Sequence, residues 1–178
     1  MPTPPPEGVR PWERVSSKDG PELIVFRSRF DRMTHPKTGE ELDRLVLETT
    51  DWVNVVALTT DQRLVVVRQY RFGTEEVTTE VPGGMVDPGE GHEESARREL
   101  LEETGYVSDH WTYLGNVDPN PAVQTNQMHH WLARDCRLEA TQELDAGEDI
   151  EVATLSEEEL RSAVSSGEIR HALVLTAL

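Results

Sequence analysis

The chain has 178 residues, a length that suits one domain with a small additional layer. Its formal net charge of −17 disfavours binding to nucleic acid and to anionic membrane surfaces. No apolar run approaches the ~20 residues of a membrane-spanning helix, and residues 1–8 lack the pattern of a secretory signal. We therefore expect a cytoplasmic protein. Its one cysteine, Cys136, is expected to be a partly buried small residue, because no local motif marks it as a catalytic thiol.

The first part of the chain predicts a proline-rich irregular arm followed by β-structure. Runs rich in Val, Ile, Leu and aromatic residues indicate strands at residues 22–30, 42–49, 53–59 and 64–70. Turn residues separate these runs at 18–21, 36–39 and 59–61. Adjacent runs around one hairpin predict an N-terminal antiparallel sheet.

A helix is predicted directly after the turn Pro88–Gly91. It covers His92–Thr104 and ends at Gly105, a residue that favours a C-terminal stop. Ala96 and Leu100 give this helix an apolar side, which Leu101 widens.

The rest of the chain alternates strands with helices. Strands are predicted at residues 112–117, 128–136 and 150–154. Ser156 and Glu159 have the spacing of a capping box at the start of a helix, and a last helix covers residues 169–178. This order predicts an α/β or α+β sandwich.

Three glutamates of the first helix share one face, because offsets of three and four residues align Glu99, Glu102 and Glu103. Their charges repel unless cations lie among them, and hard carboxylate oxygens suit Mg²⁺ or Mn²⁺. A solvated acidic face is the alternative interpretation. No zinc set competes, since the strand neighbours His129 and His130 point to opposite faces.

The surroundings of these glutamates favour the metal site. The stretch resembles the Nudix box, in which Gly is followed after five residues by Glu, and after seven more by Arg-Glu-apolar-any-Glu-Glu-any-Gly-apolar. The matching residues are Gly84, Glu90, Arg98, Glu99, Leu100, Glu102, Glu103, Gly105 and Tyr106. A chance match is on the order of one in 10⁵ to 10⁶. Tyr106 is a departure, because an aliphatic residue is more usual there.

The resemblance implies the Nudix fold, a mixed β-sheet between helices, and a hydrolase that needs Mg²⁺ or, in its place, Mn²⁺. It implies that the carbonyl of Gly83 joins the metal ligands, which are otherwise Glu99, Glu102 and Glu103. It implies structural roles for Gly84, Glu90, Arg98 and Gly105, with Glu90 and Arg98 holding the loop to the helix.

The segments that flank the box resemble those of ADP-ribose and nucleoside diphosphate sugar pyrophosphatases. The similar segments are Arg68-Gln69-Tyr70-Arg71, Glu80–Gly84, Tyr113–Gly115, Pro119–Ala122 and Trp12 with Ser16-Ser17. The resemblance implies a small-molecule substrate, ADP-ribose or a related nucleoside diphosphate sugar. Its diphosphate would be hydrolysed to a nucleoside monophosphate and a sugar phosphate.

Four further residues are candidates for the site. Arg68 and Arg71 lie on opposite faces of a strand, and Arg71 is favoured for the diphosphate over a surface ion pair. Glu80 either contacts substrate or lies on the surface of an edge strand. Glu148 resembles the late acidic residue that supplies a further metal ligand or the catalytic base, and a plain turn residue is its alternative.

Residues 1–50 are expected to form an N-terminal arm and strands, and residues 51–178 the Nudix domain. The arm resembles the segment through which related pyrophosphatases form homodimers. Trp12 would then stack on a base across the interface, although a buried core tryptophan fits equally well.

The expected reaction is attack of water on one phosphorus, with the proton taken by Glu102, Glu103 or Glu148. The loop Asn120–Asn126 lacks the Ser-Pro-Gly-Phe and acid of many ADP-ribose pyrophosphatases, which makes GDP-mannose an alternative substrate. Dinucleoside polyphosphates, capped RNA and coenzyme A are further alternatives. A non-catalytic Nudix ligand sensor is disfavoured, because the box is intact and the expected length is that of one domain.

Overall fold

The computed structural model describes residues 8–178, so the expected arm at residues 1–7 lies outside the described part. The contacts divide the chain into two compact units. Residues 120–125 belong with the N-terminal unit, because the backbone N–H of Leu47 donates to Val123 O at 2.7 Å and that of Thr125 donates to Leu47 O at 3.2 Å. Residues 50–119 and 126–178 form the second unit.

The N-terminal unit holds the predicted antiparallel sheet, with strand order β1-β2-β3. Its strands are β1 (Glu13–Glu22), β2 (Arg27–Thr34) and β3 (Glu41–Glu48). The turn predicted at residues 18–21 was wrong, and the strand predicted at residues 22–30 begins later, at Arg27. Gly20 and Pro21 lie inside β1, and the first turn is at residues 23–26, where Leu23 N donates to Phe26 O at 2.8 Å. An edge strand tolerates proline, and the register shift between Asp19 and Glu22 accommodates it.

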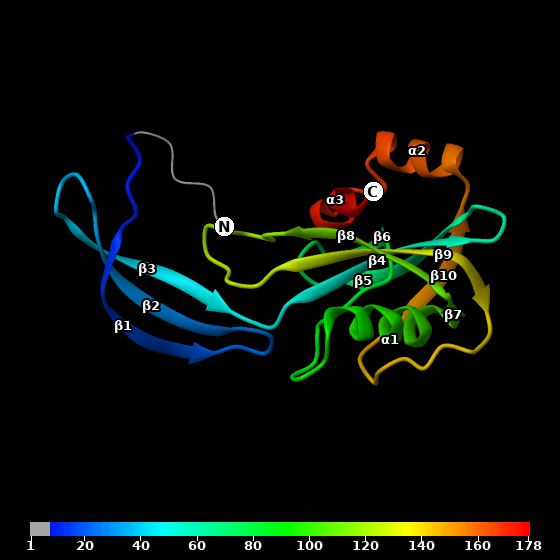
Figure 1. Ribbon diagram of the computed structural model, residues 1–178, viewed down its shortest axis with the longest axis horizontal. Helices are drawn as coiled ribbons and strands as arrows, with labels where there is room; N and C mark the ends of the chain where they lie inside the picture. The colour runs from blue at the N-terminus through cyan, green and yellow to red at the C-terminus, as the bar shows by residue number, and fades with distance from the viewer. Residues whose placement is uncertain (1–7) are drawn as a thin grey trace. The chain divides into compact units, whose positions relative to one another are not determined.

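A mixed sheet is the centre of the second unit, and its main path runs β10-β5-β4-β9-β7, with β6 paired to β5 and β8 to β9 (Figure 1). β4 and β9 are parallel, while the other pairs are antiparallel. The strands are β4 (Trp52–Thr59), β5 (Leu64–Arg71), β6 (Glu76–Glu80), β7 (Tyr106–Val107), β8 (His110–Val117), β9 (Met128–Leu138) and β10 (Ile150–Leu155). The short strands β6 and β7 were not predicted.

Three helices of the described chain pack on this sheet. They are α1 (His92–Thr104), α2 (Glu157–Ser166) and α3 (Ala172–Ala177). The bounds of α1 match the prediction, and its C-cap Gly105 has a φ of 72°, which favours glycine. The capping box of Ser156 and Glu159 is present. The last helix is shorter than expected.

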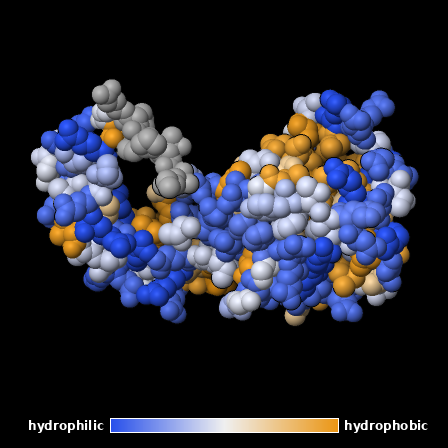
Figure 2. All heavy atoms as spheres, viewed as in Figure 1, coloured by the Kyte–Doolittle hydropathy of each residue, from blue (hydrophilic) through white to orange (hydrophobic). Residues whose placement is uncertain are grey.

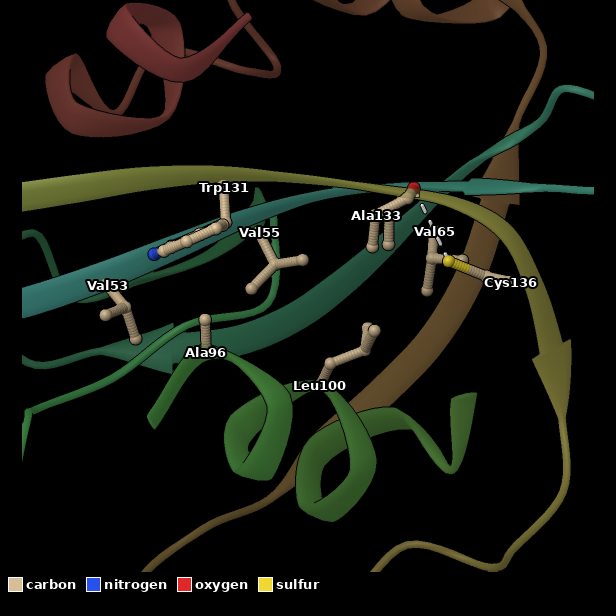
Figure 3. Close-up of a cluster of buried hydrophobic side chains, with 9 residues drawn as sticks. Val53, Val55, Val65, Ala96, Leu100, Trp131, Ala133 and Cys136 are labelled. Carbon is tan, nitrogen blue, oxygen red and sulfur yellow. Dashed lines mark hydrogen bonds between the residues drawn. The ribbon is translucent and has the colours of Figure 1, made fainter. Parts of the chain in front are cut away.

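Each face of the sheet has its own buried cluster, which confirms the sandwich. On one face, Ala96 and Leu100 of α1 point toward Val53, Val55 and Val65 of the sheet. Trp131 of β9 joins the same cluster (Figure 3). The opposite cluster joins Val66 to Ala163, Ile169 and Val174 of the α2–α3 region. Cys136 is buried more completely than predicted, and burial raises the pKa of its thiol to about 11.

The surface of both units is largely polar on the visible face, where hydrophilic residues surround smaller hydrophobic areas (Figure 2). Within residues 8–178, no helix combines the length and the hydrophobicity needed to cross a bilayer.

Neighbouring leucines on α1 test this packing. Leu100 is 1% exposed, whereas Leu101 is 38% exposed. The prediction that Leu101 widens the apolar side of the helix was therefore wrong. We expect Leu100→Ala to lower the free energy of unfolding by about 2–4 kcal/mol, because it leaves a cavity against the sheet. The matched Leu101→Ala is expected to cost less than about 1 kcal/mol. Urea unfolding of both variants measures the difference, and equal losses would contradict this account of the core.

Candidate active site

Two glycines bring the backbone against the glutamates of α1. Val53 N donates to Gly84 O at 2.9 Å, and Gly84 N donates to Val53 O at 3.1 Å, so the segment lies beside β4. A Cβ on Gly83 would overlap with the carbonyl oxygen of Val53, and one on Gly84 would overlap with Glu99 Oε1. At Gly83 only glycine permits this approach, because the overlap is with backbone, whereas a side chain at position 84 would displace the carboxylate of Glu99.

Glu103 is buried and Glu99 is partly buried at the point where that backbone meets the helix. Gly83 N donates to Glu103 Oε2 at 2.9 Å. Burial, reinforced by the charges of Glu99 and Glu148, raises the pKa of Glu103 to about 8. Burial also raises the pKa of Glu99 to about 7, despite the opposing charge of Arg98. The site therefore disfavours negative charge and would be stabilised by an added cation.

Arg98 connects the loop before α1 to the helix itself. It donates to both carboxylate oxygens of Glu90 at 3.1 Å, and to Met85 O at 3.2 Å. Its Nη1 also donates to Glu99 at 2.9 Å and to Glu102 at 3.0 Å. One guanidinium thus donates hydrogen bonds to three carboxylates, and Glu102 is the most exposed of these three.

The arginines of the predicted Arg-Gln-Tyr-Arg strand have different partners. Arg71 donates to the two oxygens of buried Glu80 at 2.7 and 2.8 Å, whereas Arg68 pairs with Glu151 at 3.3 Å. Burial pushes the pKa of Glu80 upward, but the hydrogen bonds from Arg71 and Thr78 outweigh it and hold the pKa below its usual value. The charge of Arg71 also opposes the rise in the pKa of Glu103, so Arg71 is the arginine of the pair that acts on the buried carboxylates.

Glu148 lies in the loop before β10 and is exposed. Its carboxylate accepts a hydrogen bond from Asp145 N at 3.0 Å. Its charge contributes to the raised pKa of both Glu99 and Glu103, which puts it within electrostatic range of them. Trp12 lies in the N-terminal unit, edge-to-face with His35 at 4.7 Å between ring centroids and with the guanidinium carbon of Arg44 5.0 Å from its ring centre.

The sequence did not single out three residues around this site. Thr78 donates to Glu80 at 2.6 Å, and His171 Nδ1 lies 3.8 Å from the same carboxylate. Gln142 donates to Glu103 O at 2.7 Å. None of the three belongs to a sequence motif. Their contacts with the site form only in the folded chain. Only Thr78 could have been found from the sequence, because residues two apart on a strand point to the same face, which places Thr78 beside Glu80.

A comparison with known families agrees with this geometry, because the NUDIX domain matches residues 49–177. The chain belongs to the Nudix family. Its loop–helix unit from Gly83 to Gly105 is therefore a Nudix box, and the protein is a Nudix hydrolase by family.

Relatives of known name are similar over most of this Nudix chain. The ADP-ribose pyrophosphatase of Bacillus subtilis is 31% identical over 79% of this chain and 76% of its own length. The methanol dehydrogenase activator of Bacillus methanolicus is 29% identical over 76% and 73%. A crystal structure of an ADP compounds hydrolase covers 96% of this chain and 92% of its own, with a TM-score of 0.84 at 21% identity. That likeness confirms the predicted Nudix fold.

Proposed function

We propose that this Nudix protein is a Mg²⁺-dependent pyrophosphohydrolase of ADP-ribose or a related nucleoside diphosphate sugar. The observation that carries the proposal is a pair of carboxylates with a raised pKa, buried Glu103 and partly buried Glu99, which lie against glycine backbone. Likeness to the ADP-ribose pyrophosphatase of B. subtilis supports the choice of substrate.

The residues of the box fit a divalent cation by their chemistry. Glu99, Glu102, Glu103 and the carbonyl of Gly83 offer the hard oxygen donors that Mg²⁺ and Mn²⁺ prefer. Within residues 8–178, no three acidic, His or Cys side chains are so arranged that they could hold an ion as they stand. Arg98 accounts for this, because it holds Glu99 and Glu102 in ion pairs. Binding of a cation would then require these two carboxylates to turn away from Arg98.

A bound divalent ion would neutralise charge on the diphosphate oxygens and lower the pKa of the attacking water. Arg71 is proposed to bind a phosphate oxygen. Glu80 occupies its Nε and Nη2 and fixes the plane of the guanidinium, while the side chain stays 44% exposed. Glu148 is proposed to complete the site as a further metal ligand or as the group that accepts the proton. Glu102 and Glu103 remain the alternative bases.

Removing one buried charge separates catalysis from folding. We expect Glu103→Gln to lower kcat by about two orders of magnitude or more. The variant lacks one proposed metal ligand, so the charge that develops on the phosphate is less well neutralised by the ion. The metal-free variant should melt no lower than the wild type, since a neutral amide relieves repulsion and still accepts the bond from Gly83 N.

Turnover with added Mg²⁺, turnover with EDTA and thermal melting test this expectation. Glu94→Gln is the matched control, because Glu94 is exposed on the first turn of the same helix. An active Glu103→Gln enzyme would overturn the metal assignment.

The substrate proposal predicts the products. ADP-ribose should yield AMP and ribose 5-phosphate with no free inorganic phosphate. GDP-mannose is the second candidate, because the loop at residues 120–126 lacks the usual sequence. Turnover of a panel of nucleotide sugars, dinucleoside polyphosphates and capped RNA ranks them, and mass spectrometry after hydrolysis in ¹⁸O-labelled water identifies the attacked phosphorus. Cleavage of only the last two classes would refute the proposed substrate.

A homodimer is proposed for the N-terminal unit, with Trp12 offered to a base. The turn between β1 and β2 exposes Leu23 at 51%, Ile24 at 104% and Val25 at 44%, an apolar surface that a second copy would cover. Light scattering at micromolar concentration should therefore give about twice the 20.1 kDa chain mass. Ile24→Lys should shift the protein toward the monomer, whereas Val77→Lys, at another exposed apolar position, should not. A wild-type monomer would contradict this proposal.

A further inference from the structure

The segment after β9 closes the C-terminal end of α1. The last turn of α1 reads Leu101-Glu102-Glu103-Thr104 and offers no basic side chain to the exposed carbonyls there. Backbone donors from residues 139–143 fill this role. Glu139 N and Ala140 N donate to Gly105 O at 3.0 and 3.1 Å, and Glu143 N donates to Glu102 O at 2.9 Å.

Gln142 supplies the side-chain donor in this segment. Its Nε2 donates to Glu103 O at 2.7 Å and to Ile150 O at 3.1 Å. An amide nitrogen carries two hydrogens, so one group can satisfy both carbonyls. The bridge therefore joins the end of the box helix to the first residue of β10. It closes the base of the loop formed by residues 143–149, which carries Glu148.

We propose that Gln142 is a positioning residue, a clamp at the base of this loop that holds Glu148 beside the carboxylates of α1. The inference rests on the function proposed for Glu148. Within residues 143–149 the hydrogen bonds are local: Glu148 N donates to Asp145 O at 2.9 Å, and Asp145 N donates to the Glu148 carboxylate. Those bonds shape the turn but do not attach it to the helix. The attachment comes from Gln142 and from the backbone of Glu143.

A shape-matched variant tests the clamp. Gln142→Met keeps the length of the side chain and removes both donors. We expect kcat to fall about tenfold, because small displacements of a reacting group are costly, while KM stays within about twofold. Hydrogen–deuterium exchange of the full-length protein should quicken across residues 143–149. Thr141→Ala, an exposed neighbour in the same segment, is the control and should change neither.

A double-mutant cycle with Glu148→Gln decides whether Gln142 acts through Glu148. In the Glu148→Gln background, adding Gln142→Met should change kcat less than about twofold. An equal fall in both backgrounds would mean that Gln142 serves the helix end alone and would overturn the proposal. So would unchanged exchange or unchanged kcat in Gln142→Met, or a Glu148→Gln enzyme of wild-type kcat. The cycle is run with whichever diphosphate the wild type hydrolyses, so that a wrong substrate is distinguished from a wrong clamp.

Discussion

The close approach of the Gly83-Gly84 backbone to the acidic side of α1 is the constraint on which the site depends. A Cβ on Gly83 would overlap with the backbone of β4, one on Gly84 would overlap with the carboxylate of Glu99, and Glu103 accepts a hydrogen bond from Gly83 N. The approach removes both carboxylates from water, Glu103 fully and Glu99 in part, and this loss of solvent is the main reason that their pKa values rise. Packing thus makes negative charge unfavourable at this point, and an added cation would relieve it.

Two arginines balance the charge that this packing concentrates. Arg98 pairs within the box, where Glu90, Glu99 and Glu102 share its guanidinium. Arg71 comes from the β5–β6 hairpin and is held by Glu80. Their settings differ in one respect that bears on function. Arg98 has its donors committed to three carboxylates, whereas Arg71 meets one carboxylate and keeps 44% of its side chain exposed. Arg71 is therefore the better placed of the two to meet an anionic substrate.

Local signals account for what the sequence predicted well. Neighbouring residues determine the Gly-rich turn, the helix His92–Thr104 and its end at Gly105. The pattern of the box is local in the same way. Sequence signals failed where contacts with distant parts of the chain determine the local structure. Gly20 and Pro21 look like a turn, but an edge strand with a register shift accepts them. Gln142 and His171 have no local mark, because they reach the site from segments that only the folded chain brings close to it. The alternation of side chains along a strand predicted that Arg68 and Arg71 have different surroundings. The bidentate pair of Arg71 with Glu80 could not be predicted, because it depends on the register of the β5–β6 hairpin.

The same features that prepare the site for a cation make α1 dependent on its neighbours. The three glutamates on one side of α1 repel one another, and α1 has no side-chain cap at Gly91. Burial of Ala96 and Leu100, the bonds of Arg98 and the donors of residues 139–143 hold it instead. A cation that binds the folded state alone would add to these contacts and raise stability by mass action. Such a cation would link binding to folding at this helix, because it would neutralise the charge that opposes the metal-free fold.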